Sequence, residues 1–223
     1  MIDFGLTGIA FSIDSVDASI LQCTRDMSSK QIERSITNFQ LISHARKSGN
    51  INVELGINCV VSSANCSVEI IANLLDWSLK HDLDYVNFNM IFDDGYTGEN
   101  APNLLLNEGN IEDIIKVANL FHTHPPKIHT NSYKFWLTMA SMLSGSKLDG
   151  TSCGLRDRQT ILYKGRYHFC AWLESPTLGR VGATTPQSVY NARQLFHEAS
   201  KGCHTGPHCH CLQTTDHQWE MID

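Results

Sequence analysis

Three segments of this sequence alternate apolar and polar residues, as a β-strand does when one face packs on a core and the other meets polar surroundings. They are residues 7–14 (TGIAFSID), 51–61 (INVELGINCVV) and 84–91 (DYVNFNMI). A doubly wound sheet buries both faces, so its strands usually read as continuous runs of Val, Ile and Leu. The alternation therefore favours a sheet whose second face is either exposed or turned into a polar cavity.

Four segments with helical periodicity separate or follow these strands: residues 29–47, 67–80, 110–122 and 131–145. Strands that alternate with helices predict a parallel sheet with right-handed crossovers, because parallel neighbours need a covering connection. The sequence thus predicts an α/β fold with about three parallel strands. Its polar inner face fits a barrel, or an open half-barrel, that holds a polar ligand. An exposed sheet face is the alternative.

Polar residues of this second face are candidate ligand-binding residues. Ser12 and Asp14 share a face of the first strand, and Asn87 and Asn89 share a face of the third. Asn65 follows the second strand, near the carboxyl ends where ligands bind in such sheets. Asn65 is also a plausible helix cap and Asp14 a plausible turn residue. Glu54 lies on the polar face of the second strand. It is expected to be either a substrate contact or a solvated carboxylate.

The last third of the chain has a different character and a concentration of cysteines. Residues 161–170 (ILYKGRYHFC) predict a hairpin that turns at Lys164 and Gly165, and residues 185–202 predict a helix. Five thiols in this part are candidate metal ligands, because thiolates suit zinc and iron-sulfur centres. They are Cys153, Cys170, Cys203, Cys209 and Cys211. We therefore expect one unit over residues 1–148 and a small cysteine-rich α+β module over residues 149–223.

The metal itself is open from the residues alone. The terminal cluster KGCHTGPHCHC also supplies His204, His208 and His210, which would suit a tetrahedral zinc site. An iron-sulfur cluster, zinc and no metal are the three alternatives. The remaining thiols, Cys23, Cys59 and Cys66, are interpreted as ordinary structural cysteines, and Cys59 as a small buried residue.

Charge and hydropathy exclude several classes of protein. The net charge of −6, without a basic stripe interleaved with aromatics, argues against nucleic-acid binding. No run of about 18 apolar residues is present that would span a bilayer, so no membrane partner is expected. The N-terminal residues lack the pattern of a secretory signal, which makes a cytoplasmic location the expectation. In a reducing compartment the cysteines would be free thiols or metal ligands.

Several of these elements occur together in one known family. A strand ending in SIDS, a strand followed by VVSSAN and a strand NFNMI precede a cysteine, a glycine and a second cysteine (Cys153, Gly165, Cys170), then a helix and terminal cysteines. This order resembles radical S-adenosylmethionine enzymes with a C-terminal auxiliary-cluster extension of the SPASM or twitch type. The resemblance implies a TIM-like partial barrel of which residues 1–148 are the C-terminal half. It also implies one auxiliary 4Fe-4S cluster on Cys153, Cys170 and two of the three terminal cysteines.

The resemblance also implies what surrounds the cofactor. Ser12 would lie near the ribose of S-adenosylmethionine, and the other candidate residues of the polar face would line the same pocket. The family builds its radical-generating cluster on a CxxxCxxC loop, and this sequence contains none. It is therefore expected not to cleave S-adenosylmethionine alone, and to bind it only if the barrel is completed.

Three readings of the incomplete barrel stay open. A separate chain carrying the N-terminal half completes it, the protein associates with itself, or this is a truncated product of a longer gene. The expected function is the C-terminal part of an oxidoreductase or peptide-modifying enzyme acting on a peptide or small molecule. The alternative is a non-catalytic metal-binding or electron-transfer module.

Overall fold

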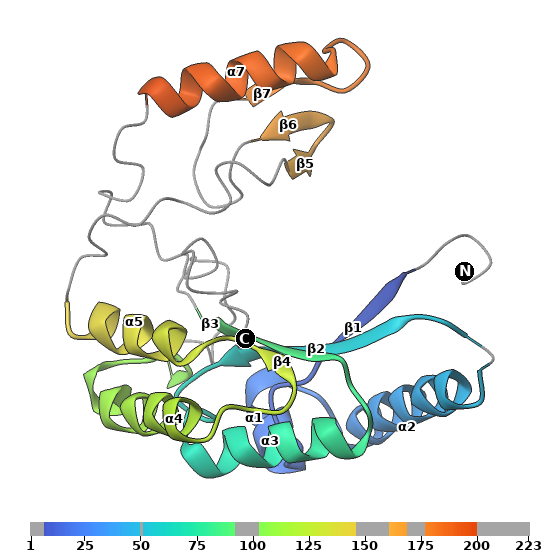
Figure 1. The fold of residues 1–223 in the computed structure, drawn as a ribbon, viewed down its shortest axis with the longest axis vertical. Coiled ribbons are helices and arrows are strands. Elements are labelled where there is room, and N and C mark those ends of the chain that lie inside the picture. The colour runs from blue at the N-terminus through green and yellow to red at the C-terminus, as the bar shows by residue number, and fades with distance from the viewer. Residues whose placement is uncertain (1–6, 50, 92–102, 146–160, 169–176, 200–223) are drawn as a thin grey trace. The chain divides into compact units, whose positions relative to one another are not determined.

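The computed structural model describes residues 7–49, 51–91, 103–145, 161–168 and 177–199 (Figure 1). The described residues fall into two compact units, residues 7–145 and residues 161–199. Each unit is described by itself below. None of the described helices combines the length and the apolar character that crossing a membrane requires.

The first unit is built on a sheet of four parallel strands in the order β1-β2-β3-β4. Its strands are β1 (Gly8–Ser12), β2 (Glu54–Val61), β3 (Tyr85–Met90) and β4 (His129–Thr130). The predicted α/β fold with a parallel sheet is confirmed, and the first three strands lie within their predicted ranges. The expectation of about three strands missed β4, because two residues are too few for an alternation to be read from sequence.

Helices connect the strands and follow them. They are α1 (Ala18–Arg25), α2 (Ser29–Lys47), α3 (Val68–Lys80), α4 (Ile111–Thr123), preceded by the 3₁₀ turn η3 (Glu108–Asn110), and α5 (Tyr133–Leu143). The four predicted helices are confirmed. Helix α1 was not predicted, since it has only eight residues and only Leu21 of them is buried. Its sequence signal is the cap Asp17, whose carboxylate accepts a hydrogen bond from the backbone of Ser19.

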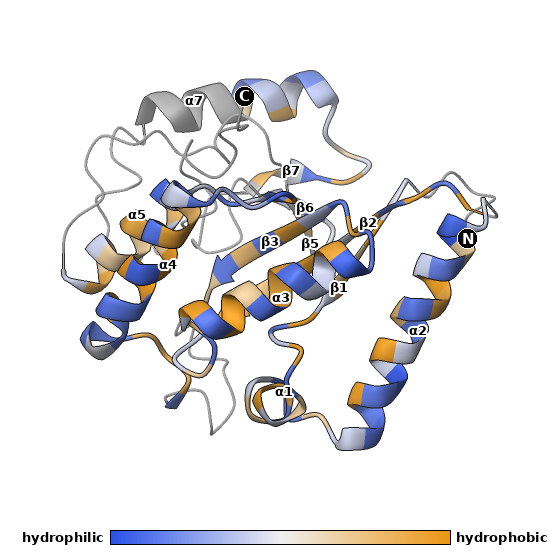
Figure 2. Cartoon of the chain, turned by 60° about the horizontal axis from the view of Figure 1, so that its bottom comes forward, coloured by the Kyte–Doolittle hydropathy of each residue, from blue (hydrophilic) through white to orange (hydrophobic). Residues whose placement is uncertain are grey.

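The core lies between the sheet and these helices. Figure 1 shows α2, α3 and α4 on one side of the sheet. The side chains of β2 that point to this side, Leu55, Ile57, Cys59 and Val61, are fully buried. Helix α2 is largely hydrophilic, whereas α3, α4 and α5 are richer in apolar residues (Figure 2). The alternation read from the sequence therefore corresponds to one face on the core and one face away from it.

Aromatic rings fill the part of the core beneath β3. The ring of Phe88 lies with its centroid 5.1 Å from that of Trp136, and Phe121 lies 5.5 Å from Trp136. Such tilted and edge-to-face contacts add to the burial of the rings themselves. Asn131 closes this region, because its Oδ1 accepts from the backbone N–H of Phe88 at 2.6 Å and its Nδ2 donates to the carbonyl of Phe88 at 3.2 Å. Its amide thereby continues the pairing of β4 with β3.

The second unit contains a small antiparallel sheet and a helix. The strands β5 (Ile161–Tyr163), β6 (Arg166–His168) and β7 (Thr177–Arg180) lie in that order, and α7 (Pro186–Ala199) follows. The predicted hairpin is present. Its turn has positive φ at Lys164 (48°) and Gly165 (70°), the conformation that two-residue hairpin turns favour. Strand β7 was not predicted.

Candidate functional site

Polar side chains form a row across the open face of the first sheet. Ser12 of β1 is in register with Asn58 of β2, and Asn58 is in register with Asn87 of β3. Asn87 donates from Nδ2 to Oδ1 of Asn58 at 3.2 Å. Ser12 is exposed, and the two asparagines are half-buried. The structure thus brings the predicted residues Ser12 and Asn87 together, with Asn58 between them.

The open face continues on both sides of this row. Asn89, another predicted residue, is half-buried and in register with Val60. On the other side, Gly56 pairs with Tyr85, and a Cβ built on Gly56 would come within 2.2 Å of the Tyr85 ring. The phenol ring therefore lies over Gly56, where only a glycine leaves room for it. Hydroxyl, amide and aromatic groups lie close together here, a combination that suits a small polar ligand with a flat ring.

Asp14 lies just beyond β1, and its carboxylate is committed to partners inside the protein. Its side chain is 2% exposed and receives two hydrogen bonds from Arg25 of α1, from Nε at 2.6 Å and from Nη2 at 2.7 Å. The backbone N–H of Val60 donates to the same carboxylate at 2.9 Å. Burial lowers the pKa of the Arg25 guanidinium, but the hydrogen bonds and charge of Asp14 outweigh burial and raise this pKa above its ordinary value. Asp14 therefore ties α1 and β2 to the end of β1.

Asn65 is completely buried beside Asp14 and completes the same joint. Its Nδ2 donates to the backbone carbonyls of Asp14 and Val60, each at 2.9 Å. Its Oδ1 accepts from the backbone N–H of Ser62 at 2.7 Å. The alternative reading of Asn65 as a helix cap is wrong, because Ser67 is the N-cap of α3. Both Asp14 and Asn65 support the carboxyl ends of the strands, and the polar row lies next to them.

Two cysteines near this joint are buried, as expected for structural thiols. Cys59 is fully buried and donates from Sγ to the backbone carbonyl of Asp14 at 3.5 Å. Burial raises the pKa of the Cys59 thiol well above its ordinary value, and burial also raises the pKa of Cys66. Neutral buried thiols are poor metal ligands. The interpretation of Cys59 as a small buried residue is confirmed.

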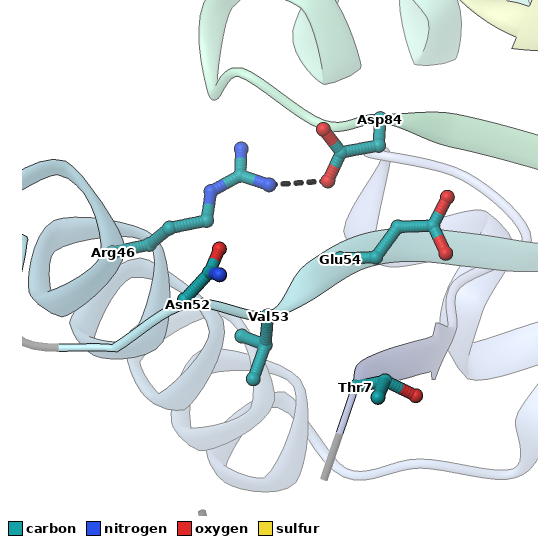
Figure 3. Close-up of a pocket in the computed structure, with 6 residues that line it drawn as sticks. All are labelled: Thr7, Arg46, Asn52, Val53, Glu54 and Asp84. Carbon is teal, nitrogen blue, oxygen red and sulfur yellow. Dashed lines mark hydrogen bonds and ion pairs between the residues drawn. The ribbon is translucent and has the colours of Figure 1, made fainter. Parts of the chain in front are cut away.

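A polar hollow of about 540 Å³ lies at the opposite, amino end of the strands (Figure 3). Its lining residues are Thr7, Arg46, Asn52, Val53, Glu54 and Asp84. Arg46 forms an ion pair with Asp84. The carboxylate of Asp84 also accepts a hydrogen bond from the backbone N–H of Leu55, with 2.7 Å between the nitrogen and Oδ2. Glu54, considered above as a substrate contact, lies here rather than in the row of Ser12, Asn58 and Asn87. Ligands of parallel sheets bind at the carboxyl ends, so the hollow is less suited to hold one.

The charge of Glu54 acts on the phenol of Tyr85. Burial raises the pKa of the Tyr85 phenol above its ordinary value, and the negative charges of Glu54 and Asp84 raise it further. We expect Glu54→Gln to lower the pKa of Tyr85, because losing a carboxylate stabilises the phenolate. Carbon-13 NMR titration of labelled tyrosine checks this, with the signal assigned by Tyr85→Phe. Glu33→Gln on the exposed surface of α2 is the control, and an equal shift in both variants would contradict the contact.

The predicted metal ligands Cys153, Cys170, Cys203, Cys209 and Cys211 lie outside the described residues. Within the described ranges, no three His, Cys, Asp or Glu side chains converge to hold a metal ion. The candidate metal centre thus stays a prediction from sequence.

Comparison with known proteins gives a fold relationship. No protein-family model matches the chain, and no curated protein matches it. Among solved structures, anSMEcpe with bound AdoMet aligns at a TM-score of 0.56 and 15% identity, covering 87% of this chain and 53% of that one. The structure of anSMEcpe with AdoMet and the Kp18Cys peptide aligns at a TM-score of 0.54 and 16% sequence identity. This alignment covers 87% of this chain and 54% of that one. The chain therefore spans about half the length of these proteins.

The aligned protein, anSMEcpe, is an anaerobic sulfatase-maturating enzyme of the radical S-adenosylmethionine type. The α/β part of the fold expected from the resemblance to that family is thus confirmed for this chain, whereas the cysteine-rich module stays a prediction. At 15 to 16% identity the likeness extends to the fold alone. Sequence reasoning missed Arg25 and the pair of Gly56 and Tyr85. The place of Asn58 in the polar row was signalled by the alternation in the second strand.

Proposed function

We propose that this chain is the C-terminal part of a radical S-adenosylmethionine oxidoreductase or peptide-modifying enzyme. The observation that carries the proposal is the shared fold with half of anSMEcpe, a protein whose structures contain AdoMet and, in two cases, a peptide. The polar row on the open face of the sheet adds a candidate binding surface. A peptide or a small molecule is the proposed substrate, and a reducing, cytoplasmic location suits the proposed iron-sulfur chemistry.

The open edge of the sheet supports completion by further strands. Within the described sheet, β1 pairs only with β2, so its other edge offers backbone groups to a new strand. A half-barrel carrying the CxxxCxxC loop, on a separate chain, would pair there and cover the polar face. Self-association through β1 is the competing arrangement. In this proposal the chain alone does not cleave S-adenosylmethionine, since these 223 residues contain no such loop.

The chemistry of the polar row fits S-adenosylmethionine. Ser12, Asn58, Asn87 and Asn89 supply neutral hydroxyl and amide groups, which match the hydroxyl groups of a ribose and the polar edge of an adenine. Asp14 and Asn65 would act indirectly, by holding the strand ends that carry these groups. When bound, S-adenosylmethionine supplies the radical chemistry of the family. The described residues would bind and orient it and, once the barrel is complete, exclude water.

The second unit is proposed to hold one auxiliary 4Fe-4S cluster. Cys153 and Cys170, with two of Cys203, Cys209 and Cys211, would be its ligands, and zinc is the alternative metal. A second function, a non-catalytic metal-binding or electron-transfer module, is favoured by one specific observation. The radical-generating CxxxCxxC loop does not occur in this sequence.

The two functions are separated by an S-adenosylmethionine binding experiment. The DNA upstream of Met1 is first read for an open frame with CxxxCxxC, and its product is co-expressed with this chain under anaerobic conditions. We expect calorimetry to detect binding to the pair and none to this chain alone. Ser12→Ala and Asn87→Ala should each weaken binding about fivefold to tenfold, the contribution of one hydrogen bond. The exposed Asn38→Ala on α2 is the matched control.

Three outcomes would decide against the enzyme. They are the lack of any such frame, a failure of the two chains to associate, and an affinity that Ser12→Ala and Asn87→Ala leave unchanged. The metal-binding module would then be the better account.

A further inference from the structure

Two arginines face each other in the small sheet of the second unit. Arg166 of β6 and Arg180 of β7 are directly opposite in the antiparallel register, and both are exposed. Directly opposite residues of such a pair lie on the same face, with Cβ atoms about 4.5 to 5.5 Å apart. Like charges in this arrangement repel and destabilise the pairing. Among the described residues, no carboxylate forms an ion pair with either guanidinium.

The backbone around the two arginines is held by specific contacts. The N–H of Arg180 donates to Oγ1 of Thr184 at 2.8 Å, and its carbonyl accepts from the N–H of Ala183 at 3.2 Å. The N–H of Val181 donates to the carbonyl of Gly165 at 3.0 Å, which links the turn after β7 to the hairpin turn before Arg166. The two guanidinium groups thus extend from a fixed framework. A fixed backbone leaves only the two arginine side chains to be ordered when a ligand binds.

The local charge is opposite to that of the chain. The described residues of the second unit contain four Lys or Arg residues and one Glu, whereas the whole chain has a net charge of −6. A cationic face on an acidic protein attracts an anionic partner and orients it toward this face. Each guanidinium group offers several N–H donors in a planar fork. This geometry binds a carboxylate through two parallel hydrogen bonds.

We propose that Arg166 and Arg180 form a docking site for an acidic peptide segment, whose Asp or Glu carboxylates bridge the two guanidinium groups. A peptide is favoured over a nucleic acid because its carboxylates are spaced along a flexible chain. A polyphosphate gains its affinity from contacts to many phosphates, and this site offers two guanidinium groups. The site requires only the folded second unit, so it does not depend on the proposed radical chemistry.

The test measures binding of a short fluorescein-labelled peptide rich in glutamate to the full chain, by fluorescence anisotropy. A peptide with glutamine in place of glutamate is the uncharged probe, and an oligodeoxynucleotide of equal charge is the polyphosphate probe. The variants are Arg166→Gln, Arg180→Gln and the double replacement. Arg34→Gln is the matched control, because Arg34 is exposed on α2 and has no ion pair among the described residues.

We expect each single variant to weaken binding of the glutamate peptide about tenfold, the double variant to abolish it, and rising salt to weaken it. The melting temperature should stay constant or rise, since each replacement removes repulsion between the two cations. An equal loss of binding in Arg34→Gln would overturn the proposal. So would tighter binding of the oligonucleotide. A lower melting temperature with unchanged binding would overturn it as well, because the arginines would then pair with carboxylates of this chain.

Discussion

Asp14→Ala should lower the free energy of unfolding of the first unit by about 3 to 5 kcal/mol, the range found when one partner of a buried ion pair is removed. The replacement leaves Arg25 partly buried without its carboxylate, and it leaves the backbone N–H of Val60 without an acceptor. A buried N–H group without an acceptor adds the free-energy cost of its own desolvation. Urea unfolding followed by circular dichroism measures this loss.

The control is an exposed ion pair of the same protein. Lys116 and Glu112 on α4 are 2.8 Å apart and both exposed, so Glu112→Ala should cause no measurable change. Asp14→Asn should fall between wild type and Asp14→Ala, since an amide oxygen still accepts from Val60 but carries no charge for Arg25. Equal stabilities of Asp14→Ala and wild type would contradict the role of Asp14 as the joint between the strand ends.

Cys170→Ala should remove the iron of the proposed auxiliary cluster, from about four iron atoms per chain to none. A cluster that lacks one of its four cysteine ligands is easily lost from the protein. Cys153→Ala should therefore lose its iron as well. The chain is reconstituted anaerobically with iron and sulfide, and its iron content and visible absorption are measured. A colourless protein that binds zinc would identify the alternative metal.

The terminal cysteines and a distant thiol refine this experiment. Comparing Cys203→Ala, Cys209→Ala and Cys211→Ala identifies which two complete the ligand set, because the variant of the spare cysteine retains its iron. Cys23→Ala is the control, since Cys23 lies exposed on α1 in the first unit. Unchanged iron in Cys170→Ala would remove that residue from the proposed ligands.

Elements with a long periodic pattern were predictable from sequence. Helix α2 runs from Ser29 to Lys47, the range predicted for it from its helical periodicity, and a capping box of Ser28 and Gln31 closes its start. Strand β4 and helix α1 escaped prediction because both are short. Strand β4 has two residues and is defined by its pairing with β3, while α1 buries only Leu21.

The candidate site divides in the same way. The alternation in the strands placed Ser12, Asn87 and Asn89 on the open face, which needs only the twofold repeat of a strand. Asp14 and Asn65 lie after the strands, where that repeat no longer fixes the direction of a side chain. Their surroundings depend on Arg25 and Val60, which are distant in sequence and adjacent only in the folded chain.

The sequence by itself determined the parallel α/β sheet with one polar face, since local periodicity and the need for covering connections suffice for that. Only the tertiary structure decided which polar residues stay on that face and which become structural. A buried carboxylate or amide must find hydrogen-bond partners, and the partners of Asp14 and Asn65 come from other segments of the chain. The pairing of Arg166 with Arg180 likewise depends on the register of two strands, which neither strand specifies alone.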